Sequence, residues 1–226
     1  MTSHTEDTAS HTEDKTIQFS KKSGKGTRDG VISELAAFFE VKPGHEEELR
    51  AAVERFADFL RNSPVEETMK TGLHDTRHVI FDGGKRLLWA TTFESDWDPY
   101  IEDALVVVGI DKFLDWMQHT NASEMIEAWM REAGGVEKLR AARGSWESES
   151  AREKSVRMSS GGLKEIIMSV QNPAAAYFNA LSDQTHPEIR KAVRVNQAFQ
   201  QVLDNPDAAE ALQHPALKPL LELAAD

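Results

Sequence analysis

The chain contains no cysteine among its 226 residues. This absence excludes disulfide bonds, thiolate nucleophiles, and zinc or iron–sulfur centres held by cysteine. No apolar run approaches the roughly 18–20 residues that a membrane-spanning helix needs, and the polar N-terminus lacks the apolar segment of a secretory signal. We therefore expect a cytoplasmic protein that does not enter a membrane.

Several common catalytic motifs are also missing. The sequence has no glycine-rich loop of the kind that cradles phosphate, no GxSxG elbow and no HExxH zinc helix. Hydrolase, kinase and nicotinamide-dependent oxidoreductase functions therefore lose their usual sequence support, and we expect no metal site.

Positive charge is in short supply. The net charge is −12, yet residues 1–30 carry five acidic and five basic side chains, so the whole deficit lies on the rest of the chain. Nucleic acid and anionic membranes attract the opposite charge balance. We expect neither as a partner.

The apolar residues, 40% of the chain, follow a clear order of secondary structure. A segment from Val31 is apolar on both faces, as in a central strand, and residues 45–62 have the spacing of an amphipathic helix. Strands near 73–81 and 86–94 flank an Asp-Gly-Gly turn, which is a strong hairpin signal. Asp98-Pro99 then begins a helix that bends at Gly109. The order β-α-β-β-α is a ferredoxin-like unit that lacks its closing strand.

The missing strand has two candidates, 164–170 and 174–180. We favour 174–180 because a helix follows it directly; 164–170 is either a helical turn or an extra strand. Capping boxes at Asn121-x-x-Glu124 and Thr185-x-x-Glu188 predict two further helices, and Asn-Pro and His-Pro pairs restart shorter helices near the C-terminus.

These patterns divide the chain into three parts. Residues 1–28 are rich in polar residues and predict a disordered tail. Residues 29–205 form an α+β domain with a helical insertion at about 119–171, and residues 206–226 form a helical extension. The predicted fold class is a ferredoxin-like antiparallel sheet of the dimeric α/β-barrel type. Apolar residues on both faces of the sheet need a cover, which a homodimer supplies; the insertion is the competing cover.

The hairpin and the helix after it resemble a bacterial family of ferredoxin-like proteins in the dimeric α/β-barrel group. The shared pattern is Leu-His-x-x-Arg, an Asp/Gly turn, an apolar strand, an aromatic residue and Trp-x-x-Tyr before an Asp. Its positions here are Leu73, His74, Arg77, Asp82, Gly83, Leu87, Phe93, Trp97, Tyr100 and Asp103. The resemblance covers residues 31–118 and 172–205. Members of the wider group include cofactor-free monooxygenases, haem-binding peroxidases and muconolactone-isomerase-like enzymes, so it implies oxidative chemistry and haem as a candidate cofactor.

The candidate catalytic residues are His74 and Arg77. A histidine suits acid–base chemistry or axial haem ligation, and an arginine suits an anionic group. Alternation places His78 on the same face as His74, with Arg77 on the other face. The two histidines are roughly 13 Å apart, so one metal ion cannot bind both. Hydrogen bonding of His74 at a rim and pairing of Arg77 with a nearby Asp are the structural alternatives.

Aromatic residues near the hairpin suggest a pocket for a small apolar or aromatic ligand. The candidate lining residues are His78, Trp89, Phe93, Trp97 and Tyr100. Ordinary packing of a sheet on helices explains the same residues. We therefore expect a small-molecule enzyme or binding protein, oxidative by resemblance. A non-catalytic module for dimerisation and protein interaction is the alternative.

Overall fold

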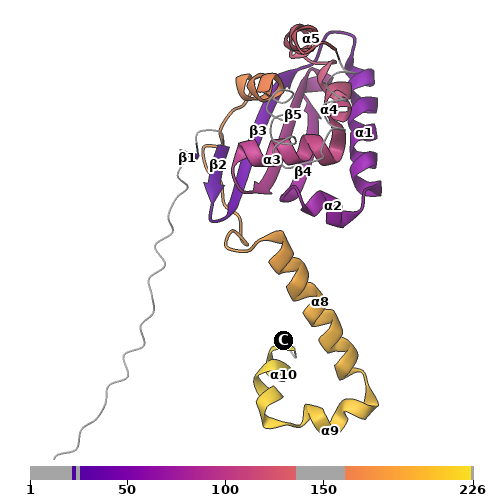
Figure 1. Ribbon diagram of the computed structural model, residues 1–226, viewed down its shortest axis with the longest axis vertical. Helices are drawn as coiled ribbons and strands as arrows, with labels where there is room; N and C mark the ends of the chain where they lie inside the picture. Colours follow the sequence, from indigo (N-terminus) through magenta and orange to yellow (C-terminus); the bar gives the residue numbers. More distant parts are fainter. Residues whose placement is uncertain (1–21, 24–25, 136–160, 225–226) are drawn as a thin grey trace, which may run out of the picture.

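The computed structural model describes residues 22–23, 26–135 and 161–224. It is an α+β structure built on an open antiparallel sheet in the order β1-β2-β3-β5-β4 (Figure 1). The strands are β1 (Lys22–Ser23), β2 (Gly26–Asp29), β3 (Ile32–Glu40), β4 (Leu73–Phe81) and β5 (Arg86–Glu94). This architecture is compatible with a ferredoxin-like fold.

The hairpin β4–β5 has the predicted boundaries. Its turn is a short 3-10 helix, η1 (Asp82–Gly84), in which all three residues have positive φ angles. Glycine adopts such angles without the strain that a side chain causes, which is why this turn could be recognised in the sequence.

Helices cover one face of the sheet. They are α1 (Glu46–Asn62), α2 (Val65–Met69), α3 (Trp97–Ala104), the π-helix η2 (Leu105–Gly109), α4 (Ile110–Met117) and α5 (Ser123–Glu132). Gly109 has a φ of 100°, so the predicted bend is confirmed. The predicted cap at Asn121 is wrong: its side chain accepts a hydrogen bond from the backbone N–H of Glu40 instead, and α5 begins two residues later.

The predicted closing strand is also wrong. Residues 174–180 form no strand, and residues 161–169 form a helix. Leu163, Ile166 and Ile167 are buried, which is helical spacing, whereas the alanine-rich segment after Pro173 has low strand propensity.

Two short pieces occupy the edge of β3 instead. Strand β2 pairs with residues 32–34 of β3, and Gln171 bridges Ala37. The predicted disordered tail, residues 1–28, is therefore wrong for residues 22–23, which form β1, and for residues 26–28, which belong to β2. The Asp29-Gly30 pair is itself a hairpin signal that the sequence analysis did not use. Residues 1–21 lie outside the described part.

The C-terminal region forms an arm that points away from the sheet (Figure 1). We call residues 186–224 the C-terminal arm. It contains α8 (His186–Leu203), η3 (Pro206–Ala208), α9 (Ala209–Leu212), η4 (Pro215–Leu217) and α10 (Lys218–Ala224). The capping box predicted at Thr185 and Glu188 is present, so the start of α8 is confirmed.

Residues 179–182, which precede the arm and which we call its base, are fixed to the turn between β2 and β3. The backbone N–H of Val31 donates to the carbonyl oxygen of Ser182 at 2.7 Å. The backbone N–H of Asn179 donates to the Asp29 carboxylate at 2.9 Å. Gly30 lies so close that a Cβ atom there would be 2.1 Å from the Ser182 oxygen.

Replacing Gly30 with alanine should therefore loosen the base of the arm. Its φ is +60°, and the added clash with Ser182 raises the total cost to about 1–3 kcal/mol of unfolding free energy. Gly83→Ala is the matched control, because its φ is +65° with no atom within 4 Å. Urea unfolding should show the larger loss for Gly30→Ala, with faster proteolysis near residue 182. Equal losses in the two variants would contradict the clash.

Candidate functional site

The two faces of the sheet separate the predicted site residues. Trp89 lies opposite His78 in the β4–β5 pairing, and their rings stack at 6.4 Å on the helix-covered face. Arg77 lies on the other face, beside a cavity. The predicted separation of Arg77 from His78 is therefore confirmed, and the sheet itself separates Arg77 from the aromatic residues. The predicted placement of His74 on the same face as His78 is wrong, because the β4–β5 pairing is irregular between Leu73 and Asp75 and Leu73 pairs with Phe93 instead.

The helix-covered face is filled by aromatic side chains. Trp89, Phe93, Trp97 and Tyr100 are all buried, and the rings of Phe93 and Tyr100 stack at 4.0 Å. The void beside Trp89 and Tyr100 measures about 10 Å³, close to the least space that one water molecule needs. Burial raises the pKa of Tyr100. These residues form a packed core in this structure.

The structure places the two predicted histidines, His74 and His78, in different surroundings. His78 is partly buried, and this burial lowers its pKa to about 4. Its Nε2 atom is buried and has no hydrogen-bond partner in the part of the chain that the structure describes. His74 lies at an irregularity in β4, where its Nε2 atom is 2.9 Å from the Glu94 carboxylate. Its ring packs against that of His186, at the start of the arm.

The opposite face of the sheet carries a cavity of about 520 Å³, which we call the sheet-face cavity. Its floor follows the strand register. Ala36 and Ala90 pair across β3 and β5, and their small side chains leave the hollow. One adjacent row, Phe38 with Leu88, is apolar.

The other row is polar. Thr92 pairs with Glu34 on β3 and with Asp75 on β4, and its hydroxyl bonds to the Asp75 carboxylate. Arg77 lies at the side, 3.7 Å from Asp75. The cavity therefore has an apolar end, a polar end and one cation at its edge.

Glu34 is the most unusual group in the cavity. The residue is only 7% exposed, and its Oε1 atom is buried with no hydrogen-bond partner among the described residues. Burial raises the pKa of Glu34, against smaller opposing effects from the backbone of Ala174, from the side chain and backbone of Thr27, and from Arg77. A buried carboxyl oxygen without a donor is costly, and such groups are more frequent at functional sites than elsewhere.

The chain covers part of this cavity itself. Residues 172–177 form the wall opposite the sheet, anchored where the Asn172 N–H donates to the Ala36 carbonyl oxygen at 2.9 Å. Burial raises the pKa of Tyr177 in this wall. Glu34, Ala36, Ala90 and Tyr177 are not among the site residues predicted from the sequence. The only available signal was the alternation of Glu34, Ala36 and Phe38 on one face of their strand.

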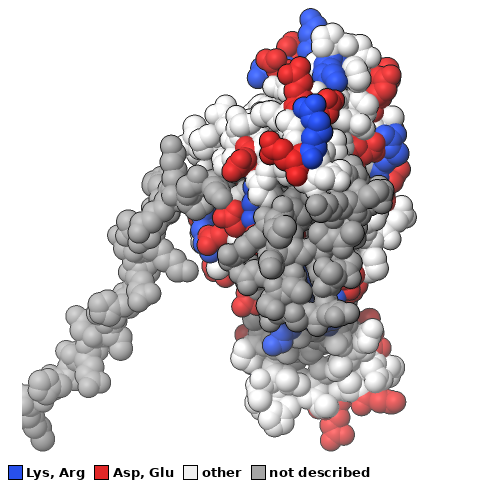
Figure 2. Space-filling view, turned by 45° about the horizontal axis from the view of Figure 1, so that its top comes forward, with Lys and Arg blue, Asp and Glu red and all other residues white. Residues whose placement is uncertain are grey.

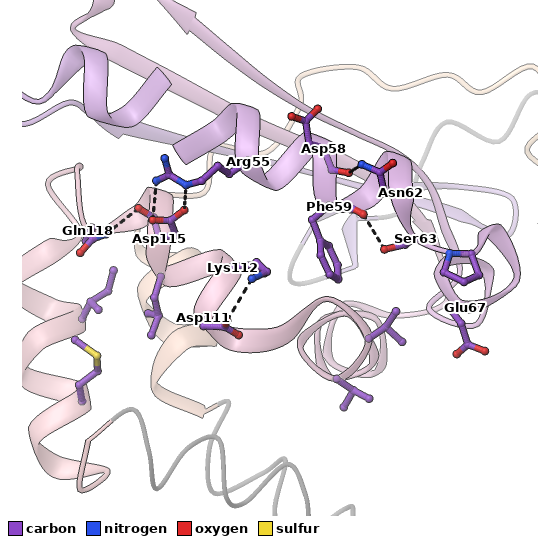
Figure 3. Close-up of a pocket in the computed structure, with 16 residues that line it drawn as sticks. Arg55, Asp58, Phe59, Asn62, Ser63, Glu67, Asp111, Lys112, Asp115 and Gln118 are labelled. Carbon is purple, nitrogen blue, oxygen red and sulfur yellow. Dashed lines mark hydrogen bonds and ion pairs between the residues drawn. The ribbon is translucent and has the colours of Figure 1, made fainter. Parts of the chain in front are cut away.

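A second, larger hollow lies among the helices, and we call it the helical groove. Its volume is about 1,190 Å³, and α1, α2, η2, α4 and α5 line it. Figure 3 shows the ring of Phe59 projecting into it and Arg55 joined to Asp115 by two bonds, each 2.9 Å long. Lys112 and Asp111 lie 3.5 Å apart. The charged groups at the rim therefore interact with one another.

Neither hollow resembles a metal site. Within the described residues, no three histidine or acidic side chains are arranged to hold an ion. His45 and His119 come close, with Nδ1 atoms 2.9 Å apart, and burial lowers the pKa of His119. Haem ligation also finds little support, because neither His74 nor His78 lines the sheet-face cavity.

The described surface seen in Figure 2 mixes acidic and basic side chains. No helix in the described ranges is both long and apolar enough to cross a bilayer. A search of protein-family models, of curated proteins and of solved structures finds no match to this chain.

Proposed function

We propose that this chain binds a small apolar or aromatic molecule in the sheet-face cavity. The observation that carries the proposal is the buried, unpartnered Glu34 oxygen beside a floor of two alanines. A volume of about 520 Å³ falls within the range of roughly 300–1,000 Å³ that is usual for ligand pockets. The framework is a ferredoxin-like sheet whose open face carries the site.

The two ends of the cavity define the ligand. Its apolar part lies on Phe38 and Leu88, while a hydrogen-bond donor, such as a hydroxyl or amine, reaches Glu34. Such a donor would satisfy an oxygen that otherwise has no partner. Arg77 remains available at the edge for an anionic substituent.

Oxidative chemistry remains a separate prediction. Glu34 is better placed than His74 to exchange a proton with a bound molecule, because Glu34 lines the cavity and its pKa is raised. A cofactor-free reaction would use this carboxyl group, with Arg77 as an anion anchor. The proposal concerns binding. Oxidative turnover would be measured only with a molecule that has first been shown to bind.

Filling the cavity should abolish binding. The Ala36→Leu substitution places a larger side chain on the floor, and we expect it to weaken binding of 1-aminoanthracene, an aromatic amine, by at least about tenfold, or about 1.4 kcal/mol. Fluorescence titration measures the affinity. Ala51→Leu, at an exposed position of α1, is the control for an added leucine. Mass spectrometry of molecules that co-purify with the protein would then identify the natural ligand.

The role of Glu34 has its own control. Glu34→Met should reduce the preference for 1-aminoanthracene over anthracene, which has no donor, while anthracene affinity is kept.

Unchanged affinity in Ala36→Leu would remove the cavity as the binding site. An unchanged preference in Glu34→Met would remove Glu34 as the acceptor.

A further inference from the structure

The C-terminal arm has no core of its own. None of the residues in α8, η3, α9, η4 or α10 is buried. Isolated helices of this length are marginal in water, and most helix stability in proteins comes from packing an apolar face. The arm therefore needs a surface that the described part of its own chain does not provide.

Helix α8 has an apolar stripe suited to such packing. Val195, Phe199 and Val202 follow i, i+4, i+7 spacing and share one face. Val195 is 59% exposed and Val202 is 43% exposed. The same helix has three basic residues, Arg190, Lys191 and Arg194, against one acidic residue, Glu188.

The helical groove has the complementary chemistry. Its floor is apolar: Phe59, Val106, Val107, Leu114, Ile126 and Met130 line it. Its charged lining comprises four acidic residues (Asp58, Glu67, Asp111 and Asp115) and two basic ones (Arg55 and Lys112). Acidic residues thus outnumber basic ones in the lining of the groove, where Asp58 and Glu67 pair with Arg61 and Lys70 just outside it, whereas basic residues outnumber acidic ones on α8.

We propose that helix α8 of one copy of this chain docks in the helical groove of a second copy, and that the second copy does the same in return. An amphipathic helix in an apolar groove is a common mode of protein recognition. A helix about 10 Å wide fills about 1,200 Å³ over about ten residues, which matches the groove volume of about 1,190 Å³.

The arm does not reach the groove of its own chain. It leaves the body beside α2, where Arg190 lies 3.9 Å from Glu66, and then points away (Figure 1). That ion pair shows the basic side of α8 already meeting an acidic residue at the end of α2 that adjoins the groove. The remaining length of α8 is therefore free to enter another copy.

A second copy fits better than an unrelated protein. Every copy carries both one arm and one groove, so a twofold exchange satisfies both surfaces at once. Each helix contact then occurs twice. The doubling brings the total buried area closer to the roughly 1,600 Å² of a standard interface. Both the basic helix and the groove belong to this chain, so a second copy offers each surface the partner that it needs.

The oligomeric state of the full chain tests the proposal. Light scattering during size-exclusion chromatography should give twice the 25.3 kDa chain mass. The Val195→Asp/Val202→Asp variant should raise the dimer dissociation constant at least 100-fold, because the new charges enter an apolar floor. Gln197→Asp/Gln201→Asp adds the same charge to the polar side of α8 and should remain dimeric. A monomeric wild type, or a dimeric and folded valine variant, would overturn the proposal.

Engineered cysteines locate the contact, since the chain has none of its own. Two separately made chains, one with Val195→Cys and one with Gln118→Cys at the groove, are mixed and oxidised. A disulfide-linked pair should form, and Gln197→Cys in place of Val195→Cys should give at least tenfold less.

Two other results would count against docking in the groove. The first is Val195→Cys linking equally to Val79→Cys on the open sheet face. The second is a photo-crosslinker at Gln118 labelling residues 136–160 of its own chain and not a second copy. Ligand binding in the sheet-face cavity is measured independently, so either proposal can fail alone.

Discussion

Replacing Trp89 with alanine is expected to lower the free energy of unfolding by about 3–5 kcal/mol. The side chain is 1% exposed, and its ring contacts those of Trp97, Phe113 and Trp116. Its indole N–H also donates to Thr76 at 3.0 Å. Truncation therefore removes aromatic packing, leaves a large cavity and breaks a buried hydrogen bond.

Urea unfolding followed by circular dichroism measures this loss. Phe178→Ala is the control for removal of a ring, because Phe178 is 79% exposed and its truncation should cost under about 0.5 kcal/mol. The result also separates the two roles considered for Trp89. If Trp89→Ala keeps its stability and loses only ligand binding, Trp89 is a pocket wall and our assignment to the core is wrong.

Features that depend on residues close together in the sequence could be predicted, whereas features that depend on distant residues could not. The hairpin could be placed because Asp82, Gly83 and Gly84 supply positive φ angles within the segment itself. The start of α8 could be placed because Thr185 and Glu188 cap it within four residues. Local chemistry fixes both features, whatever the rest of the chain does.

The edge of β3 could not be placed in the same way. Thr27 pairs with Glu34, whereas Gln171 bridges Ala37 from far along the sequence. A single missing strand is the simplest completion of a β-α-β-β-α order. Two short pieces from distant parts of the chain occupy this edge instead. The Asp29-Gly30 pair marks the β2 piece locally, but no local pattern marks the bridge from Gln171 to Ala37.

The candidate site shows the same division. Alternation along β4 correctly separated Arg77 from His78, because neighbouring strand residues face opposite sides. It could not show that the aromatic side was the filled one. The hollow depends on Ala36 facing Ala90 across two strands, and alanines carry no chemical signal in a sequence.

The partly buried His78 should make the protein sensitive to acid. Its pKa is about 4 in the folded state because burial disfavours the charged ring, and about 6.5 in the unfolded chain. Between these values the unfolded state binds one more proton than the folded state, so lowering the pH favours unfolding. Stability should fall by up to about 1.4 kcal/mol for each pH unit between about 6.5 and about 4, most steeply in the middle of that range.

The comparison with His78→Leu isolates this effect. Leucine fills the site among Phe56, Trp89 and Trp116 without a titrating group, and other groups, including Glu34, titrate equally in both proteins. Urea unfolding at pH 7, 6, 5 and 4.5 should show the wild type losing stability relative to the variant throughout that range. Parallel stability curves would mean that the folded protein protonates His78 as readily as the unfolded chain does. The ring would then have access to water, and the helix-covered face would be open enough to admit a ligand after all.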